Sequence, residues 1–276
     1  MLINNETRLF LSASAHPSNF GVTVYNTLFG KLGLNAVYLC RKVTDAHGLI
    51  HAIRTLDVAG CSVSMPLKRQ VIPHLAELDP LAKELQSVNT IIHKDGQLKG
   101  FNTDVFGVQN CITQIRPLHR VLIYGAGSVT SSIVRVLKQE CSAEVFFLAR
   151  RPEQARAMAA QYGVRSVESA SEIKEHFDLV INATPASAQA RSAANEELYR
   201  LLDHAPSFFD LVVSPVDTPW VTEAKHRKHH AISGIEMAIY QFQKQFELYT
   251  GLLPQISDVR TIVKKYMNAR HLVQAA

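Results

Sequence analysis

The sequence lacks the long apolar runs that membrane-spanning helices need. Nowhere among its 276 residues do about 18 apolar residues occur together. The N-terminus, MLINNETRLF, has no basic segment followed by a long apolar stretch, as a secretory signal would have. We therefore expect no membrane partner and a cytoplasmic protein.

Clustered metal-binding and disulfide-forming residues are also missing. The four cysteines, Cys40, Cys61, Cys111 and Cys141, show no CxxC spacing and are expected to be reduced. The densest group of histidines, in KHRKHH at 225–230, has no carboxylate or cysteine neighbour that would complete a ligand set. We expect no metal site.

The sequence has no strong excess of charge of one sign. The 29 lysines and arginines exceed the 24 acidic residues by five, which permits an anionic ligand without requiring a nucleic acid. The basic segment 225–230 has no interleaved aromatic residues and is more typical of a solvated helix end than of a nucleic-acid site. We expect one or two ordinary domains that bind a small molecule and no nucleic acid.

The sequence does contain a regular alternation of short apolar runs and helical segments. RLFLSAS at 8–14, a helical stretch at 22–32 and AVYLCRKV at 36–43 are typical of βαβ units with a largely parallel sheet. Asp95-Gly96, between two further apolar runs, predicts a hairpin. The fold class predicted is α/β.

A second unit begins at RVLIYGAGSVTSSIVRVLKQ, residues 120–139. It predicts a strand, a glycine turn and an amphipathic helix, with Gly125 and Gly127 where a dinucleotide pyrophosphate needs close backbone approach. The third glycine of the usual fingerprint is replaced by Thr130. A tight turn without a ligand is the alternative.

The next strand, EVFFLAR, ends in Arg150-Arg151 instead of an acidic residue that would bind a ribose 2'-hydroxyl. Two guanidinium groups suit a 2'-phosphate, so this pair favours NADP over NAD. An exposed basic pair without a ligand is the alternative. Further strands are expected in 177–185, 208–213 and 230–234, and ligands bind at such strand ends in open parallel sheets.

Six short motifs occur in one order: SVSMPLK, SVNT, FNTD, GAGSV, NATP and GIEMAIYQ. In that order and spacing, from about residue 10 to 251, the chain resembles the shikimate/quinate dehydrogenase family. The resemblance implies a substrate domain at 1–104, completed by C-terminal helices at 236–276, a Rossmann domain for the nicotinamide cofactor at 105–235, and a site in the cleft between them. It also implies an NADP-dependent oxidoreductase of aromatic amino acid biosynthesis, interconverting shikimate or a related cyclic hydroxy acid and its 3-dehydro ketone.

The resemblance assigns the catalytic roles to Lys68 and Asp104. Reduction of a ketone by hydride leaves negative charge on the oxygen, so a cation that can donate a proton is needed beside it. Asp104 would orient the Lys68 ammonium. The alternative is a surface lysine together with an aspartate that caps the following helix.

The substrate-binding residues implied by the resemblance are Ser64, Asn89 and Gln241. Asn19 and Gly21, in HPSNFGVTVYN, fall where the family has two serines that bind the substrate carboxylate. Losing a hydrogen bond to a charged group typically costs about 1.5 to 3 kcal/mol, so we expect altered or weakened specificity. This SNFG segment resembles a shikimate dehydrogenase-like branch of the family.

The cofactor-binding residues implied are Gly125, Ala126, Gly127, Ser128, Val129, Arg150, Arg151, Asn182, Thr184 and Gly234. A ligand-binding paralogue that keeps the fold without useful turnover is an alternative to the enzyme, favoured by the changed SNFG segment and the missing third glycine. The retained Lys68 and Asp104 favour the enzyme, because a binding protein needs no proton donor. We expect a monomer or a homodimer.

Overall fold

The computed structural model describes residues 3–127, 129–184 and 193–274. The chain forms two compact units, Met1–Asp104 with Ile239–Ala276 and Val105–Ala238. The assignment of substrate to the first and cofactor to the second stays a prediction.

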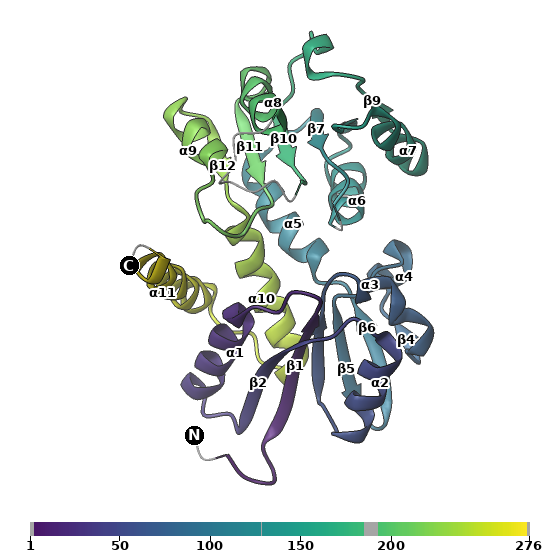
Figure 1. Ribbon diagram of the computed structural model, residues 1–276, viewed down its shortest axis with the longest axis vertical. Coiled ribbons are helices and arrows are strands. Elements are labelled where there is room, and N and C mark those ends of the chain that lie inside the picture. The colour runs from purple at the N-terminus through teal and green to yellow at the C-terminus, as the bar shows by residue number, and fades with distance from the viewer. Residues whose placement is uncertain (1–2, 128, 185–192, 275–276) are drawn as a thin grey trace. The chain divides into compact units, whose positions relative to one another are not determined.

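The first unit is built on a six-stranded sheet with the order β2-β1-β3-β5-β6-β4 (Figure 1). The strands are β1 (Arg8–Ser14), β2 (Ala36–Lys42), β3 (Gly60–Val63), β4 (Glu77–Leu78), β5 (Thr90–Lys94) and β6 (Gln97–Phe101). Strands β1, β2 and β3 are parallel, and β5 runs antiparallel to both β3 and β6. The predicted hairpin joins β5 to β6, where Asp95 and Gly96 both have positive φ angles, 51° and 72°.

Helices of the first unit come from both ends of the chain. They are α1 (Asn19–Lys31), α2 (Ala46–Thr55), α3 (Leu67–Gln70), α4 (Pro80–Leu85), most of α10 (Gly234–Thr250) and α11 (Ile256–Gln274), with the 3-10 turn η1 (Ile72–His74). Asp45 and Asp79 begin α2 and α4, because each carboxylate accepts from backbone N–H groups of the first turn. Gly60 in β3 allows α10 to pack closely on this strand, because a Cβ at Gly60 would lie 2.6 Å from the Tyr249 ring.

The second unit is a parallel six-stranded sheet with the order β12-β11-β10-β7-β8-β9. Its strands are β7 (Arg120–Tyr124), β8 (Glu144–Leu148), β9 (Arg165–Ser166), β10 (Leu179–Asn182), β11 (Ser207–Asp210) and β12 (His230–Ile232). Its helices are α5 (Asp104–Ile112), α6 (Thr130–Glu140), α7 (Pro152–Tyr162), α8 (Ala193–Leu201) and α9 (Pro219–His226), with the 3-10 turns η2 (Thr113–Ile115), η3 (Ala170–Glu172) and η4 (Leu202–His204).

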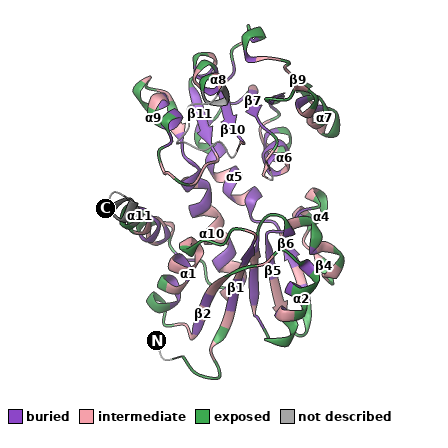
Figure 2. Cartoon of the chain, in the orientation of Figure 1, coloured by how far each residue is buried: buried purple, intermediate pink, exposed green. Residues whose placement is uncertain are grey.

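If the six strands are numbered 1 to 6 along the chain, starting with β7, their order across the sheet from β9 to β12 is 3-2-1-4-5-6. This is the doubly wound arrangement of Rossmann domains. Strands β7, β10 and β11 are almost wholly buried (Figure 2), and so is β8, as parallel strands covered on both faces must be. The predicted α/β class with a Rossmann-type domain is confirmed. None of the four cysteines, all of which the structure describes, forms a disulfide.

Candidate active site

Lys68 and Asp104 form a close ion pair in the first unit. Lys68 lies in α3, just after β3, and Asp104 is the first residue of α5. The lysine Nζ is 2.6 Å from the aspartate Oδ2, and the side chains are 12% and 3% exposed. The lysine side chain therefore keeps a small contact with solvent, while the aspartate side chain that holds it is buried.

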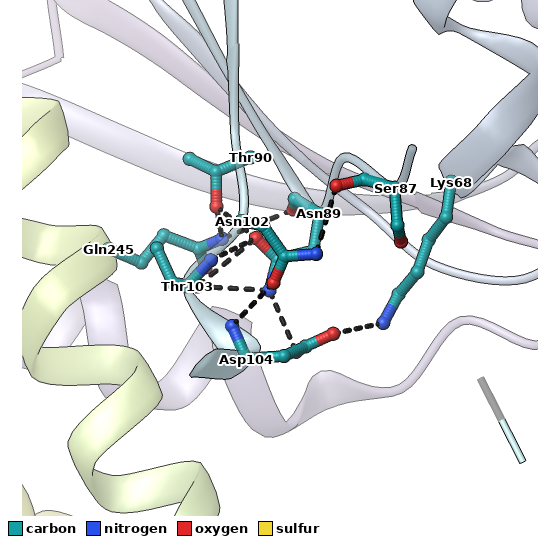
Figure 3. A network of polar contacts seen from close by, with 8 residues as sticks. All are labelled: Lys68, Ser87, Asn89, Thr90, Asn102, Thr103, Asp104 and Gln245. Carbon is teal, nitrogen blue, oxygen red and sulfur yellow. Dashed lines mark hydrogen bonds and ion pairs between the residues drawn. The ribbon is translucent and has the colours of Figure 1, made fainter. Parts of the chain in front are cut away.

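The Asn89 side chain fixes the other oxygen of that carboxylate (Figure 3). Its Nδ2 donates to Asp104 Oδ1 at 2.8 Å, and its Oδ1 accepts from the Thr103 backbone N–H at 2.9 Å. Because a backbone N–H can only donate, the contact with Thr103 assigns the orientation of the amide. Both carboxylate oxygens of Asp104 thus accept from side chains, unlike those of a helix-capping aspartate, which accept from backbone N–H groups two or three residues on.

Backbone and amide contacts bring the three motifs that contain these residues together. The Asn102 amide donates to the Ser87 carbonyl at 2.9 Å and accepts from the Asp104 backbone N–H at 3.0 Å. The Val88 N–H donates to the Lys68 carbonyl at 2.8 Å. These hydrogen bonds therefore hold the lysine, the asparagine and the aspartate close together beside the sheet.

The other residues predicted to bind substrate lie outside this network. Ser64 and Asn19 are exposed, and Gln241 is half-buried in α10. Cys40 Sγ lies 3.6 Å from Asn19 Oδ1. At Gly21 a Cβ would lie 3.3 Å from the ring of Tyr38, so this ring borders the space that a serine side chain would need. Their substrate-binding roles stay predictions.

Gln245 is a site residue that the sequence analysis missed. It lies one helical turn after Gln241 and is only 2% exposed. Its Nε2 donates to Thr90 Oγ1 at 2.5 Å, and its Oε1 accepts from Ser62 Oγ at 2.7 Å and from the Tyr25 hydroxyl. The i,i+4 spacing of two glutamines on an apolar helix was the available signal.

Three buried tyrosines surround the far side of Gln245. The hydroxyls of Tyr38 and Tyr249 lie 2.6 and 2.8 Å from Ser62 Oγ. Since the single proton of Ser62 goes to Gln245, both tyrosines donate to the serine. Burial raises the pKa of Tyr25, Tyr38 and Tyr249 above the usual value, so all three keep their protons as hydrogen-bond donors.

In the second unit, the glycines of the turn between β7 and α6 pack closely against the segment that follows β10. A Cβ at Gly127 would lie 2.5 Å from the Ala183 carbonyl oxygen. Gly125 has a φ of 101° and no room for a side chain beside Thr184. Thr130, in place of the third glycine, begins α6 and is 1% exposed. Its buried Oγ1 has no hydrogen-bond partner in the described part of the chain.

The remaining residues of this turn differ in exposure. Ala126 is exposed, Val129 immediately precedes α6, and Ser128 lies outside the described residues. At Gly234 a Cβ would lie 2.5 Å from the Leu211 carbonyl oxygen, so this glycine permits α10 to start against the segment that follows β11.

Asn182 and Thr184 shape the segment against which the glycine turn packs. Asn182 Oδ1 accepts from the Thr184 N–H and hydroxyl at 3.0 and 2.7 Å, and its Nδ2 donates to Asp210 at 2.9 Å. Burial raises the pKa of Asp210, against the opposing effect of hydrogen bonds from Thr218, Val212 and Asn182. The polar atoms of Asn182 are thus used inside the protein.

Arg150 lines a pocket of about 290 Å³ at the end of β8. The pocket is lined by Arg150, Ser169, Ala170, Ser171, Glu196, Glu197 and Arg200. Arg151, which the sequence analysis paired with Arg150, instead immediately precedes α7, and the second guanidinium of the pocket belongs to Arg200 on α8. Glu197 accepts from the Tyr124 hydroxyl at 2.6 Å. No local sequence signal joins positions fifty residues apart.

Comparison with known proteins identifies the family. Two family models match, the shikimate dehydrogenase substrate binding domain at residues 19–91 and shikimate/quinate 5-dehydrogenase at 112–236. A shikimate dehydrogenase-like protein of Haemophilus influenzae is 33% identical over 257 residues, covering 92% of this chain and 94% of the relative. The chain belongs to the shikimate dehydrogenase family.

A second curated relative and a solved structure are similar to this chain along nearly their whole length. A shikimate dehydrogenase (NADP(+)) of Pyrococcus abyssi is 32% identical over 245 residues, covering 87% of this chain and 90% of the relative. The solved structure of a shikimate 5-dehydrogenase-like protein has a TM-score of 0.85 at 31% identity, covering 95% of this chain and 98% of its own. The predicted family, and the likeness to a shikimate dehydrogenase-like branch, are confirmed.

The family matches divide the candidate residues between two segments. The substrate-domain match contains Lys68 and Asn89, and the second match contains the glycine turn and Arg150. None of the helices in the described ranges combines the length and the apolar composition that a membrane span requires. Nor does that part of the chain bring together three or more histidine, cysteine or acidic side chains that could hold a metal ion.

Proposed function

We propose that this protein is an NADP-dependent oxidoreductase that interconverts shikimate, or a related cyclic hydroxy acid, with its 3-dehydro ketone. The observation that carries the proposal is the ion pair between Lys68 and the buried Asp104, in a chain of the shikimate dehydrogenase family. The pathway would be aromatic amino acid biosynthesis, and the relative from Pyrococcus abyssi carries NADP(+) in its name.

Lys68 is proposed to act at the oxygen of the reacting carbon. When bound, the cofactor would supply the hydride as NADPH or accept it as NADP⁺. As the ketone is reduced, charge develops on its oxygen, and the lysine ammonium donates a hydrogen bond and then a proton to that oxygen. In the oxidation direction the lysine amine takes the hydroxyl proton. Asp104 holds the nitrogen at 2.6 Å and so limits where the proton can be delivered.

The second unit is proposed to hold the cofactor. The glycine turn offers backbone N–H groups at the start of α6 without side chains in the way at Gly125 and Gly127. The guanidinium groups of Arg150 and Arg200 suit a 2'-phosphate, which favours NADP. Glu196 and Glu197 in the same pocket would accept hydrogen bonds from ribose hydroxyls, which would suit NAD. NAD is therefore proposed as the second, less favoured cofactor.

Binding of the substrate carboxylate is proposed to differ from that in other family members. Asn19 provides an amide and Gly21 no side chain at the two positions that resemble the carboxylate-binding serines. An amide can still donate one hydrogen bond to a carboxylate. We therefore propose that shikimate itself binds with lower affinity than in family members that have the two serines.

Two further proposals concern the whole protein. We propose that it is cytoplasmic and that it is a monomer or a homodimer.

The test is reduction of NADP and, separately, of NAD by the purified protein with shikimate, quinate and a small panel of cyclic hydroxy acids, followed by absorbance of the reduced cofactor. NADP-dependent turnover of shikimate is the expected result. Turnover of another acid alone would assign the SNFG segment to a change of substrate. No turnover across the panel, with NADPH still bound, would contradict the proposal and favour the ligand-binding paralogue.

A further inference from the structure

A chain of hydrogen bonds runs from Gln245 on α10 to the carboxylate beside Lys68 (Figure 3). Gln245 Nε2 donates to Thr90 Oγ1 at 2.5 Å, and Thr90 Oγ1 donates to Asn89 Oδ1 at 2.8 Å. Asn89 Nδ2 then donates to Asp104 Oδ1 at 2.8 Å. Every donor in this Gln245 chain, which consists of Gln245, Thr90 and Asn89, points toward the carboxylate, so each bond polarises the next.

The chemistry of the groups fixes this direction. A threonine hydroxyl has one proton, and Asn89 Oδ1 can only accept, so the Thr90 oxygen must accept from Gln245. Gln245 Nε2 also lies 3.4 Å from the Asn89 carbonyl, a second acceptor. On the other side, Gln245 Oε1 accepts from the hydroxyls of Tyr25 and Ser62. The glutamine amide therefore has a single orientation that satisfies its partners.

Burial makes this arrangement costly to disturb. Thr90 is 0% exposed, and Asn89, Gln245 and Asp104 are each 2% exposed. A buried polar group that loses its partner has no solvent to replace it. Because Asn89 occupies Oδ1 of Asp104, the oxygen Oδ2 is left to Lys68 Nζ at 2.6 Å.

We propose that Gln245 and Thr90 are positioning residues for the reaction. They hold the Asn89 amide on Asp104 Oδ1 and thereby fix the carboxylate with Oδ2 toward the Lys68 amine. The use of Lys68 in catalysis rests on the proposed function, whereas the hydrogen-bond chain rests on the geometry of the first unit alone. Neither residue needs to touch the substrate for this role.

A matched pair of variants at Thr90 tests the proposal. Thr90→Val keeps the shape and removes the hydroxyl, and Thr90→Ser keeps the hydroxyl. We expect Thr90→Val to lower kcat by about 10- to 100-fold with little change in KM. The reason is that the position of the Lys68 amine beside Asp104 matters for proton transfer in the transition state and not for binding of the substrate. Thr90→Ser should restore most of kcat. Equal losses in the two variants, or a raised KM with normal kcat in Thr90→Val, would overturn the proposal.

A double variant separates one shared chain from two independent effects. Gln245→Met has similar length and no amide, and it interrupts the same chain as Thr90→Val. The double variant should therefore lose no more kcat than the more affected single variant, and losses that multiply would overturn the proposal. Tyr249→Phe is the control, because it removes a buried hydroxyl that contacts Ser62 and lies outside the chain. It should lower the melting temperature and leave kcat near the wild-type value; an equal loss of kcat would assign the effect to general packing and refute the positioning role.

A second readout does not depend on turnover. The rate at which an amine-acetylating reagent modifies Lys68, followed by peptide mass spectrometry, reports how firmly Asp104 holds the amine. We expect severalfold faster labelling in Thr90→Val and Gln245→Met, and wild-type rates in Thr90→Ser and Tyr249→Phe. Faster labelling in a protein that turns over no acid would support the chain and contradict the proposed function. Unchanged labelling and unchanged kcat in Thr90→Val, in an active enzyme, would overturn the positioning role alone.

Discussion

Replacing Asp104 by asparagine is the sharpest perturbation of the candidate site. The side chains have almost the same shape, so packing is kept and only the charge and one acceptor change. Asp104 Oδ1 accepts from Asn89 Nδ2 at 2.8 Å, and Oδ2 accepts from Lys68 Nζ at 2.6 Å. The two donors approach different oxygens, and an asparagine has an oxygen at only one of these two places, so it can accept from Asn89 or from Lys68 but not from both in their present positions.

The magnitude follows from these two contacts. With its oxygen toward Asn89, the new amide nitrogen faces the lysine ammonium, and with the oxygen toward Lys68, two amide nitrogens face each other. In the first orientation Asp104→Asn loses a charge-assisted hydrogen bond worth about 1.5 to 3 kcal/mol. Lys68 is 12% exposed, so part of its charge can still be solvated, and we expect the lower half of that range. The melting temperature of the protein should fall by about 3 to 8 °C.

The effect on turnover should exceed the effect on stability. Without the carboxylate, nothing orients the amine, and kcat should fall by roughly 10²- to 10⁴-fold, the range for loss of a positioned acid or base. Initial rates of NADP reduction with the best acid of the panel measure this, and calorimetry measures unfolding of the same samples. A variant that loses the expected stability but keeps kcat within about threefold of the wild type would remove the ion pair from the mechanism.

Three further predictions concern both units. Lys68→Ala should lower turnover by roughly 10²- to 10⁴-fold while near-wild-type circular dichroism shows the fold intact, and a near-normal rate would exclude this lysine as the proton donor. Arg150→Ala and Arg200→Ala should each weaken NADPH binding by about 10- to 150-fold and NADH binding much less, whereas Arg151→Ala should change neither; titration calorimetry decides, and equal effects on both cofactors would contradict a 2'-phosphate site. Burial raises the pKa of Asp210, so the folded protein binds a proton at this carboxyl more readily than the unfolded chain does. The contribution of Asp210 to stability should therefore decrease as the pH rises from about 3.9, the pKa of an aspartate in the unfolded chain, through the raised pKa of the folded protein. The melting temperature of the wild type minus that of Asp210→Asn should fall over this interval, and a difference that does not change with pH would refute the assignment.

Local features of the sequence were enough to predict the fold class. The apolar runs at β7, β8, β10 and β11 and the glycine turn before α6 are patterns within about twenty residues, and short-range periodicity and backbone conformation determine such elements. The hairpin at Asp95-Gly96 is of the same kind, because two residues with positive φ set its turn. Lys68, Asn89 and Asp104 could be singled out because each stands in a short motif.

Only the tertiary structure determines which side chains far apart in the sequence contact one another. Gln245 reaches Thr90 across 155 positions of sequence because α10 packs on β3 and β5, and no local pattern encodes that packing. Arg200 on α8 lines the same pocket as Arg150, although the two arginines are fifty positions apart in the sequence. Gly21 borders Tyr38 because α1 packs on β2. Sequence periodicity determines which face of an element is buried, whereas the partners across that face depend on the sheet order and on side-chain volumes that the whole fold must satisfy at once.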